Sequence, residues 1–525
     1  MAINPRPLAP TPSPPSITIS TDLSAMVNAS QQALLSMPKA PLVFQRARQL
    51  CLIAYGIKPP KWLQRPADAP VIVPLDREYL VELLTQAADW QKYNKRTDEH
   101  EAAMPPAQVV KTLLARPFQP FPLLEGILSA PTLRPDGSIL DRPGYDQDTA
   151  LWLDANGTAY PKMPPKPSLD QARSAIGRLQ EAFTDFPFTH THHFSAAIAA
   201  VLTLVARYTF QGNVPLFGVS ATTRASGKGL LVDAIATIGT GRTAPHWPQT
   251  TEEEEERKRV LTLALDGDPL VLIDNVTQPL GSAPLDAALT AQTFKDRILG
   301  KTQSREAPMN AVFFATGNNM AYQGDMARRV LPIDLDPRME RPEERTGFQH
   351  APLLPWVRQH RSVLVIAALT ILKAYFSAGC PSQGFTQLGS FEAWSDLIRG
   401  ALVWAGEADP CEGRKSIEAE NDPQYEALDI LLDTWEQCYG VQAKTLNHVL
   451  QDISLYTQDT AAPPDKWDDL QEALGAMDPR YDSKRLNTRL LGEAFSRYQG
   501  RTIDGRRFIR NGFDHKVALW KIEIL

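Results

Sequence analysis

Short apolar runs that alternate with helical segments constrain the fold of this chain more than any other feature. Four such runs lie between residues 168 and 345, and they read VPLFGVS, DPLVLIDN, NAVFFATGNN and ARRVLPIDLD. Strands that alternate with helices form a largely parallel sheet, because each helix returns the chain to the same edge. The sequence therefore predicts an α/β core over residues 167–345, a parallel sheet flanked by helices.

The remaining sequence divides into four further predicted regions. Residues 1–30 are rich in proline and predict a disordered leader, because such a segment cannot bury enough apolar surface to fold. Residues 31–166 predict an N-terminal accessory domain, with helices followed by a small β element that is marked by turn dipeptides. Residues 346–460 predict a helical lid and its extension, and residues 466–525 predict a basic C-terminal domain.

The overall composition excludes several classes of protein. Of the 525 residues, 43% are hydrophobic and 22% are charged, which is ordinary for a globular protein. Neither a secretory signal nor an apolar run of about 18 residues is visible, so we expect a cytoplasmic protein without a membrane partner. The four cysteines are far apart, which favours a reducing compartment and argues against a cysteine zinc site.

The loop after the first apolar run has the composition of a phosphate cradle. Small residues and a following helix N-terminus let backbone N–H groups approach phosphates, and Lys228 would contact them directly. The match to a P-loop is incomplete, because Thr222 replaces its first glycine and Gly229 replaces its final Ser or Thr. A glycine-rich helix entry is the alternative interpretation. The candidate nucleotide-binding residues are Thr223, Ala225, Ser226, Gly227, Lys228, Gly229 and Leu230.

Three later segments favour the nucleotide interpretation. Asp274 ends the second apolar run, where a carboxylate can hold Mg²⁺. Asn318 ends the third run, where an amide can orient water, and Arg328 and Arg329 precede the fourth, from which they can reach a neighbouring subunit. Each feature alone is more common as a structural or surface element. Their order along one chain favours a nucleotide site.

The order SGK, LVLIDN, ATGNN and DMARR resembles the AAA+ core of superfamily 3-type helicases. More closely, the chain is similar to the helicase-like half of primase-helicases from phages, plasmids and integrated mobile elements, roughly over residues 75–410. The resemblance implies a hexameric ring ATPase that uses ATP and Mg²⁺ and acts on single-stranded or forked DNA in replication. It leaves a separate primase open as a partner. It assigns Lys228 to the P-loop, Asp274 to Walker B, Asn318 to the sensor, and Arg329 or Arg328 to the arginine finger.

Two departures from that pattern leave the activity open. Gly229 lacks the hydroxyl that usually ligates Mg²⁺, and Asn275 occupies the position of the catalytic glutamate that often follows Asp274. Either a helicase hydrolyses ATP between subunits, or the protein is a weakly hydrolysing DNA-binding or assembly factor, such as an initiator or helicase loader. An acid from Glu252–Glu256 could replace the glutamate, but a solvated first helical turn is the interpretation of that run that the sequence favours. A role in anti-phage defence would use the same site.

The C-terminal domain has the charge expected of a DNA-binding module. Between Arg480 and Lys521 there are 11 Lys and Arg against 4 Asp and Glu. An amphipathic helix precedes a β-hairpin with predicted turns at Asp504-Gly505 and Asn511-Gly512, a layout typical of a winged helix. A basic protein-interaction module is the alternative. The candidate DNA-binding residues are Lys484, Arg485, Arg489, Arg506, Arg507 and Arg510.

Three histidines stand close together in the segment FPFTHTHHF. His190, His192 and His193 could bind a metal ion, but no cysteine or distant histidine pair accompanies them. A polar loop between two helices is the interpretation that the sequence favours.

Overall fold

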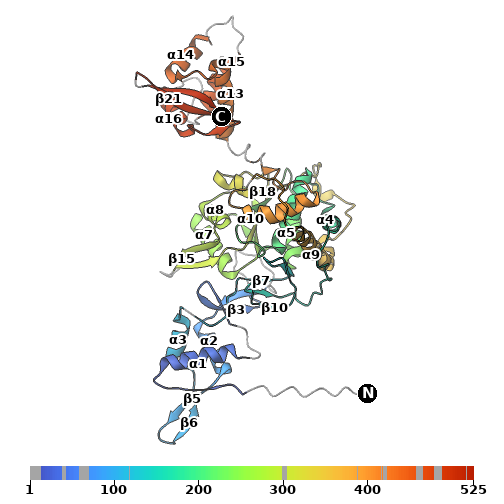
Figure 1. Cartoon of the computed structure of the whole chain (residues 1–525), viewed down its shortest axis with the longest axis vertical. Coiled ribbons are helices and arrows are strands. Elements are labelled where there is room, and N and C mark those ends of the chain that lie inside the picture. Colours follow the sequence, from blue (N-terminus) through green and yellow to red (C-terminus); the bar gives the residue numbers. More distant parts are fainter. Residues whose placement is uncertain are drawn as a thin grey trace. The chain divides into compact units, whose positions relative to one another are not determined.

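The computed structural model describes most of the chain and divides it into two units. The described residues are 13–37, 43–57, 70–117, 119–297, 304–386, 388–414, 417, 423–456, 465–477, 487–515 and 517–525. The first unit comprises Met1–Arg414 and the second comprises Lys415–Leu525. Each unit has its own hydrophobic core, so we describe each by itself (Figure 1).

The N-terminal part of the first unit mixes short helices with small sheets. Its helices pack around a common apolar cluster, and its strands form sheets of two or three strands. The elements are β1 (Ser16–Thr18), α1 (Leu23–Leu35), β2 (Phe44–Arg46), β3 (Gln49–Ala54), β4 (Val71–Pro74), α2 (Arg77–Ala87), β5 (Asp89–Asn94), β6 (Glu99–Ala102), α3 (Ala107–Ala115), β7 (Gly126–Leu128), β8 (Thr132–Leu133), β9 (Ile139–Leu140), β10 (Gly144–Asp146) and β11 (Leu151–Leu153).

This part corrects two predictions. The disordered leader is wrong from residue 16 onward, because β1 pairs in parallel with β5 and α1 buries Val27 and Leu34 in the core. Residues 1–12 lie outside the described residues. The accessory domain does contain helices followed by small strands, but strands β2 to β4 and the β5–β6 hairpin also lie among the helices, where the sequence predicted none.

The predicted parallel sheet is confirmed and has five strands. It consists of β12 (Leu216–Ala221), β13 (His246–Pro248), β14 (Leu270–Val276), β17 (Val312–Asn318) and β18 (Val330–Leu335). Their order is β13-β14-β17-β12-β18, and every neighbouring pair is parallel. All five strands therefore end at the same edge, with β17 between β12 and β14. The short strand β13 was not predicted.

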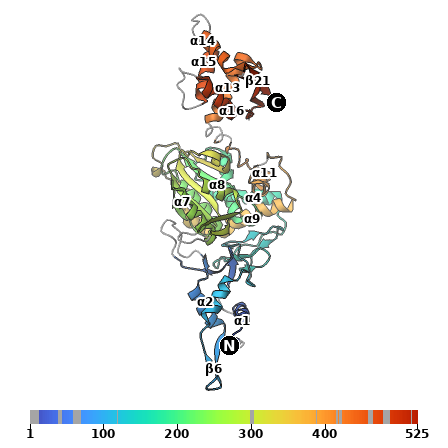
Figure 2. The ribbon, with the colours of Figure 1, turned by 90° about the vertical axis from the view of Figure 1, so that its left-hand side faces the viewer.

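Helices and connecting elements complete the core of the first unit. They are α4 (Leu169–Phe183), α5 (Thr191–Val205), α6 (Lys228–Thr240), α7 (Glu253–Asp266), α8 (Ala283–Thr290), η1 (Gly324–Arg329), η2 (Pro342–Glu344), α9 (Leu353–Ser377), α10 (Glu392–Trp394), η3 (Ser395–Arg399) and α11 (Gly400–Ala405). A hairpin of β15 (Thr293–Arg297) and β16 (Ser304–Pro308) lies against α7. Figure 2 shows α4, α9 and α11 side by side, and these helices contact one another.

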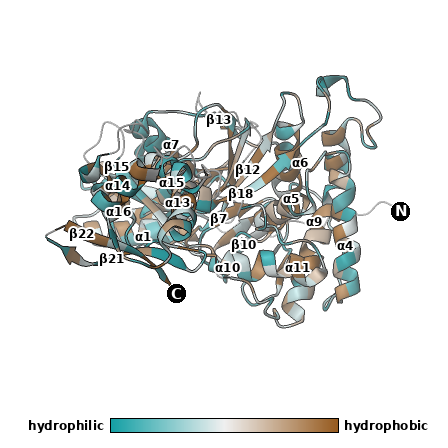
Figure 3. Ribbon diagram, turned by 90° about the horizontal axis from the view of Figure 1, so that it is seen from above, coloured by the Kyte–Doolittle hydropathy of each residue, from teal (hydrophilic) through white to brown (hydrophobic). Residues whose placement is uncertain are grey.

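Two helices illustrate how sequence produces this packing. Helix α4 begins at a capping box, in which the Ser168 and Gln171 side chains each bond the other's backbone N–H. It alternates hydrophilic and hydrophobic residues along its length (Figure 3) and buries one face. Helix α9 is long and apolar enough to span a membrane, but it is the core helix of this unit, with Leu364, Leu369 and Leu372 fully enclosed.

The predicted boundaries after the sheet are wrong. Helices α9 to α11 share the apolar core of the sheet, so they do not form a separate lid domain. The second unit begins at Lys415 and includes α13 (Pro423–Tyr439) and α14 (Leu446–Tyr456), which were predicted as part of that lid. Their buried residues join one core with the C-terminal strands, because Leu431 and Trp435 pack with Phe495 and Phe508.

In its described residues, the second unit combines four helices with a four-stranded antiparallel sheet. Besides α13 and α14 it contains α15 (Asp465–Ala476), α16 (Thr488–Tyr498), β19 (Lys444–Thr445), β20 (Thr502–Ile503), β21 (Arg506–Asp514) and β22 (Val517–Ile524). Asp504-Gly505 forms the predicted turn, with positive φ at both residues. The predicted turn at Asn511-Gly512 is wrong: these residues form an irregularity within β21. The winged helix stays a prediction.

Candidate nucleotide-binding site

Parallel pairing brings three of the predicted residues to one edge of the sheet. Lys228 begins α6 directly after the loop that follows β12, and Asn318 ends β17 beside it. Asp274 lies near the end of β14, on the other side of β17. Residues far apart in sequence therefore meet because the carboxyl ends of parallel strands share an edge, which is where open α/β sheets bind ligands.

The loop between β12 and α6 has the strained geometry of a tight cradle. Ala225 has φ of 57° and Gly227 has φ of 86°, both in the left-handed region that favours glycine. The Ser226 hydroxyl donates to the Thr223 carbonyl at 2.7 Å and closes the loop on itself. The backbone therefore turns sharply into the N-terminus of α6, an arrangement suited to anions.

The Lys228 ammonium lies at the centre of the site. It donates to the Thr223 carbonyl at 3.0 Å and to the Asn318 side-chain oxygen at 2.7 Å. Partial burial lowers its pKa, and the charge of Asp274 acts in the opposite direction. Lys228 is thus held by neutral acceptors, which a phosphate group can replace with a stronger charge-assisted bond.

The Asp274 carboxylate has partners on both of its oxygens. Thr316 of β17 donates to one oxygen at 2.6 Å, and the His246 ring lies 3.2 Å from the other. The second nitrogen of His246 lies 3.9 Å from Asp233 of α6. The Asp233 carboxylate and the Asp274 charge raise the pKa of His246 against the effect of its burial. The sequence identified neither residue: Thr316 lies within ATGNN, where only Asn318 was assigned a role, and His246 belongs to none of the motifs.

These groups surround a cavity of about 330 Å³, which we call the phosphate cavity. It is lined by Ala225, Ser226, Gly227, Lys228, Gly229, Asp274, Asn275, Thr316 and Gly317. Asp274 is the lining residue that carries a carboxylate. The predicted residue Thr223 acts through its carbonyl and its hydroxyl contact with Ser226 instead. Asn318 reaches the site through Lys228.

The structure shows the surroundings of Gly229 and Asn275, the two residues that depart from the family pattern. A Cβ atom at Gly229 would meet nothing within 4 Å, so packing does not require glycine there. Asn275 has φ of 55° at an irregularity between β14 and β17, and its N–H donates to Thr316. Asparagine tolerates this left-handed conformation better than most residues with a side chain. Both positions therefore face the cavity and lack the usual functional group.

The acidic run Glu252–Glu256, which precedes β14 along the chain, does not line the phosphate cavity. Glu254 and Glu255 pair with Lys258 and Arg259 on the same helix. Glu256 is buried and accepts a hydrogen bond from Ser282, and its burial raises its pKa. These contacts favour the structural interpretation of the run, as the first turn of α7.

A second cavity lies beside the loop and is largely apolar. This apolar cavity has a volume of about 570 Å³ and shares Ala225, Ser226 and Gly227 with the phosphate cavity. The predicted residue Leu230 faces it, together with Phe186, Pro337, Phe348, Leu353 and Arg358. Motif matching missed these residues because they come from two distant segments, although the proline-rich stretch after β18 was a visible signal.

The two arginines before β18 have different environments. The Arg329 guanidinium forms ion pairs with Asp286 of α8 and with Asp325. Arg328 is exposed at the end of η1, and its carbonyl accepts a hydrogen bond from Arg414. Arg328 is therefore the arginine of the pair whose side chain projects toward solvent.

The predicted DNA-binding residues in the second unit are not equivalent. Arg506 is largely surrounded by carboxylates, with Asp433 at 2.6 Å, Glu436 at 2.9 Å and Asp429 at 3.5 Å. These contacts make it a structural residue that ties β21 to α13. Arg507 pairs with Glu523 across the sheet.

The other candidates in this unit remain closer to solvent. Arg489 is exposed on α16, 3.6 Å from Glu493. The Arg510 guanidinium lies over the Phe513 and Trp520 rings. Lys484 and Arg485 lie outside the described residues.

Comparisons with known proteins give only distant likenesses. No protein-family model and no curated protein matches the chain. The apo C-terminal region of NrS-1 has 13% identity and a TM-score of 0.36, with 76% of this chain and 86% of that chain covered. SCCmec type IV Cch, described as an active helicase, has 12% identity and a TM-score of 0.33, with 77% and 83% covered. Likenesses of this size do not establish a shared activity.

Proposed function

We propose that the first unit binds ATP with Mg²⁺ and is the ATPase core of a DNA helicase or translocase of a mobile genetic element. One observation carries the proposal: Lys228, Asp274 and Asn318 converge beside a left-handed loop at the edge of a parallel sheet. The position of β17 between β12 and β14 supports the AAA+ part of the proposal, because the proposed sensor Asn318 ends the strand between those that lead to Lys228 and to Asp274.

The two adjoining cavities fit the two ends of a nucleotide. Lys228 and the loop N–H groups would hold the phosphates, while the apolar cavity would receive the base, with Phe186 and Leu230 in its wall. Asp274 is placed to hold Mg²⁺ beside the phosphates, and Thr316 and His246 keep its carboxylate in position. Mg²⁺ bound there would offset phosphate charge during transfer.

Two further roles fall to residues of this chain, that of a sensor and that of an arginine acting in a neighbouring subunit. Asn318 is placed to sense the terminal phosphate, because Lys228 must leave its amide when a phosphate enters. Exposed Arg328 is the better candidate for an arginine that acts in a neighbouring subunit of a ring, since Arg329 is already paired. A homo-hexameric ring in the cytoplasm, with DNA as partner and a separate primase, completes the proposal.

Contacts with DNA rest on exposed basic groups. In the second unit Arg489 and Arg510 are the candidates that the structure leaves nearest to solvent. In the first unit the β15–β16 hairpin carries Lys295 and Arg297, which are both exposed. Such residues favour contacts with DNA phosphates, so we expect DNA affinity to fall as the salt concentration rises.

Phosphate release from ATP, measured with and without single-stranded DNA, tests this function. We expect turnover that requires Mg²⁺ and increases with DNA. A protein that binds ATP without turnover would support the second candidate, a DNA-binding or assembly factor in which ATP joins subunits. The cavity lining favours that candidate at one point, because Asn275 stands where a glutamate would activate water.

Restoring the missing hydroxyl should strengthen Mg²⁺ binding. We expect Gly229→Thr to lower the Mg²⁺ concentration for half-maximal activity about 10-fold, as a hydroxyl bond to a charged partner allows. A Cβ atom at this position would meet nothing within 4 Å, so we expect the fold to tolerate the substitution. Mg²⁺ titration of ATP turnover, or of ATP binding, gives the result. Gly229→Val has the same shape without the hydroxyl, and an equal gain in that variant would contradict the prediction.

Mg²⁺ binding should depend on pH through His246. Because its pKa is raised, the ring stays protonated to higher pH and competes with Mg²⁺ for Asp274. We expect the Mg²⁺ affinity to increase from about pH 6 to about pH 8, and His246→Gln to flatten this dependence. Protonation of ATP affects both proteins equally, so comparing their Mg²⁺ affinities at each pH removes its contribution. His515→Gln, at a residue 99% exposed in the second unit, is the control. Parallel curves for wild type and His246→Gln would contradict the prediction.

A further inference from the structure

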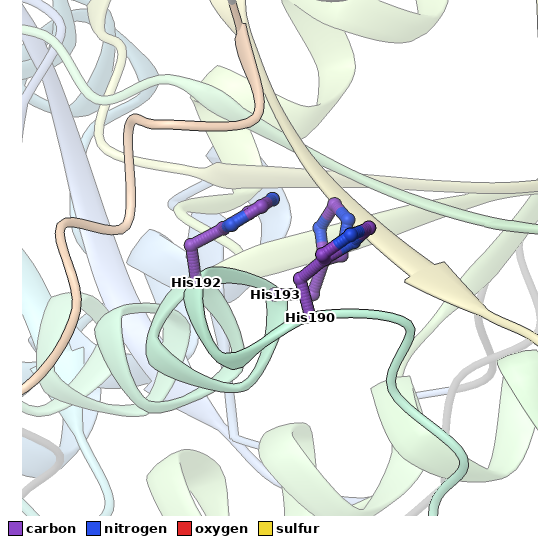
Figure 4. A group of neighbouring side chains, drawn as sticks. All are labelled: His190, His192 and His193. Carbon is purple, nitrogen blue, oxygen red and sulfur yellow. The ribbon is translucent and has the colours of Figure 1, made fainter.

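The three histidines of the FPFTHTHHF segment form a cluster outside both cavities. His190 is the N-cap of α5, while His192 and His193 lie in its first turn, so the favoured interpretation as a polar loop is wrong. One ring nitrogen from each histidine gives a set of three atoms that all lie within 4.8 Å of one another (Figure 4). The His192 and His193 ring centres are 4.2 Å apart.

Hydrogen bonding fixes the tautomer of His193. Its Nδ1 lies 3.0 Å from the Pro332 carbonyl of β18, and a carbonyl can only accept, so Nδ1 carries the hydrogen. In the neutral ring Nε2 then has a lone pair, which lies 3.3 Å from the Asp334 carboxylate. A lone pair facing a carboxylate is unfavourable unless a proton or a metal ion lies between them.

Burial makes a second proton on this ring the less favourable solution. The His193 side chain is 4% exposed, and burial lowers its pKa. Burial also lowers the pKa of His192, and its neighbour His193 acts in the same direction. Burial therefore favours the neutral imidazole at His192 and His193, and neutral imidazole is the form that binds transition metals.

Two carboxylates from other segments supply the opposite charge. Asp334 of β18 faces His193, and Glu412 lies 3.8 Å from His192. They offset the positive end of the α5 helix dipole, which by itself would repel a cation. The segment that carries Glu412 lies directly on the cluster, because a Cβ atom at Gly413 would be 3.1 Å from the His192 ring.

We propose that His190, His192 and His193 form a structural Zn²⁺ site, with Asp334 or Glu412 as the fourth ligand. Imidazole nitrogens with one carboxylate suit Zn²⁺. In a tetrahedral site the ligand atoms are about 3.3 Å apart, so the rings must close by a small side-chain rotation. His190 is exposed, and its ring, which lies 3.2 Å from the Thr189 hydroxyl, would make this rotation. His193 Nδ1 donates to the Pro332 carbonyl, and metal-binding histidines usually make such a hydrogen bond with the ring nitrogen that does not bind the metal.

A bound ion would join three segments of the first unit. These are the N-terminus of α5, the edge strand β18 and the segment around Glu412, which precedes the end of this unit at Arg414. The same segment contacts η1, which carries Arg328, because the Arg414 side chain donates a hydrogen bond to the Arg328 carbonyl. The ion would therefore fix the segment that supports the exposed arginine.

Zinc titration of the full chain tests the site. The protein must carry no histidine tag, and it is stripped with a chelator before ZnCl₂ is added against a chromophoric competitor. We expect one Zn²⁺ per chain, a higher Tm with Zn²⁺, and the visible absorption of tetrahedral Co²⁺ after substitution. His190→Gln and His192→Gln should each weaken Zn²⁺ binding about 10-fold or more.

The variants are chosen so that a negative result is informative. His190 is exposed, so His190→Gln should fold normally and remains informative even if a variant of buried His193 does not. His515→Gln removes an exposed histidine of the second unit and should bind Zn²⁺ like the wild type. Absence of stoichiometric binding, or unchanged affinity in both His190→Gln and His192→Gln, would overturn the proposal.

Discussion

Lys228→Ala is expected to lower ATP affinity about 100-fold or more and to abolish phosphate release. The ammonium makes hydrogen bonds to Thr223 and Asn318 in the cavity, and these are the bonds that a phosphate would take over. Removing a charge-assisted bond to a multiply charged ligand leaves that charge uncompensated in a partly buried site. Equilibrium binding of a fluorescent ATP analogue and a phosphate-release assay measure the two effects.

Lys258→Ala provides the matched control for this loss. Lys258 forms a surface ion pair with Glu254 on α7, and such a pair contributes little to stability. We expect its ATP affinity and turnover to equal those of the wild type. If Lys228→Ala bound ATP as tightly as this control, the loop would be a glycine-rich turn, and the proposed function would fail with it.

Asp274→Asn is expected to reduce Mg²⁺-dependent turnover by about two orders of magnitude or more while the fold stays intact. The amide has the shape of the carboxylate and can keep the Thr316 contact, but it lacks the negative charge that attracts Mg²⁺. Because Asp274 is the carboxylate of the cavity lining, the described residues offer no close substitute. ATP turnover across a range of Mg²⁺ concentrations measures the effect.

Measurements of ATP binding distinguish a lost response to Mg²⁺ from a lost affinity for ATP. We expect Asp274→Asn to bind ATP without Mg²⁺ as the wild type does, because Lys228 and the loop are unchanged. The two variants should therefore differ, with Lys228→Ala losing nucleotide and Asp274→Asn losing its response to Mg²⁺. Full turnover in Asp274→Asn would remove the Walker B assignment and leave the loop assignment standing.

The fold was predictable where local sequence and burial agree. Continuous apolar runs such as Leu270–Ile273 must be buried on both faces, which a parallel sheet flanked by helices provides. The prediction failed where long-range contacts decide the outcome. β1 exists because β5 offers it a partner, and α13 belongs to the second unit because Trp435 packs against Phe495 and Phe508.

The charged candidates show the same division. Arg506 and Arg507 read as phosphate-binding residues in a basic sequence, yet Arg506 is held by carboxylates of α13 that lie about 70 residues earlier. Arg328 and Arg329 are neighbours in sequence, but Asp286 engages only one of their side chains in the described contacts. A one-dimensional pattern cannot reveal such pairing.

The alternation of strands and helices was enough to predict the parallel sheet core and the residues that gather at its edge, because such alternation requires a common edge. The tertiary structure decided what those residues contact. It brought His246 and Thr316 to Asp274, placed the apolar cavity beside the loop, and gathered His192 and His193 with Asp334 and Glu412. The reason is physical: periodicity reports which face of an element is buried, whereas the partners on that face come from segments that only folding brings together.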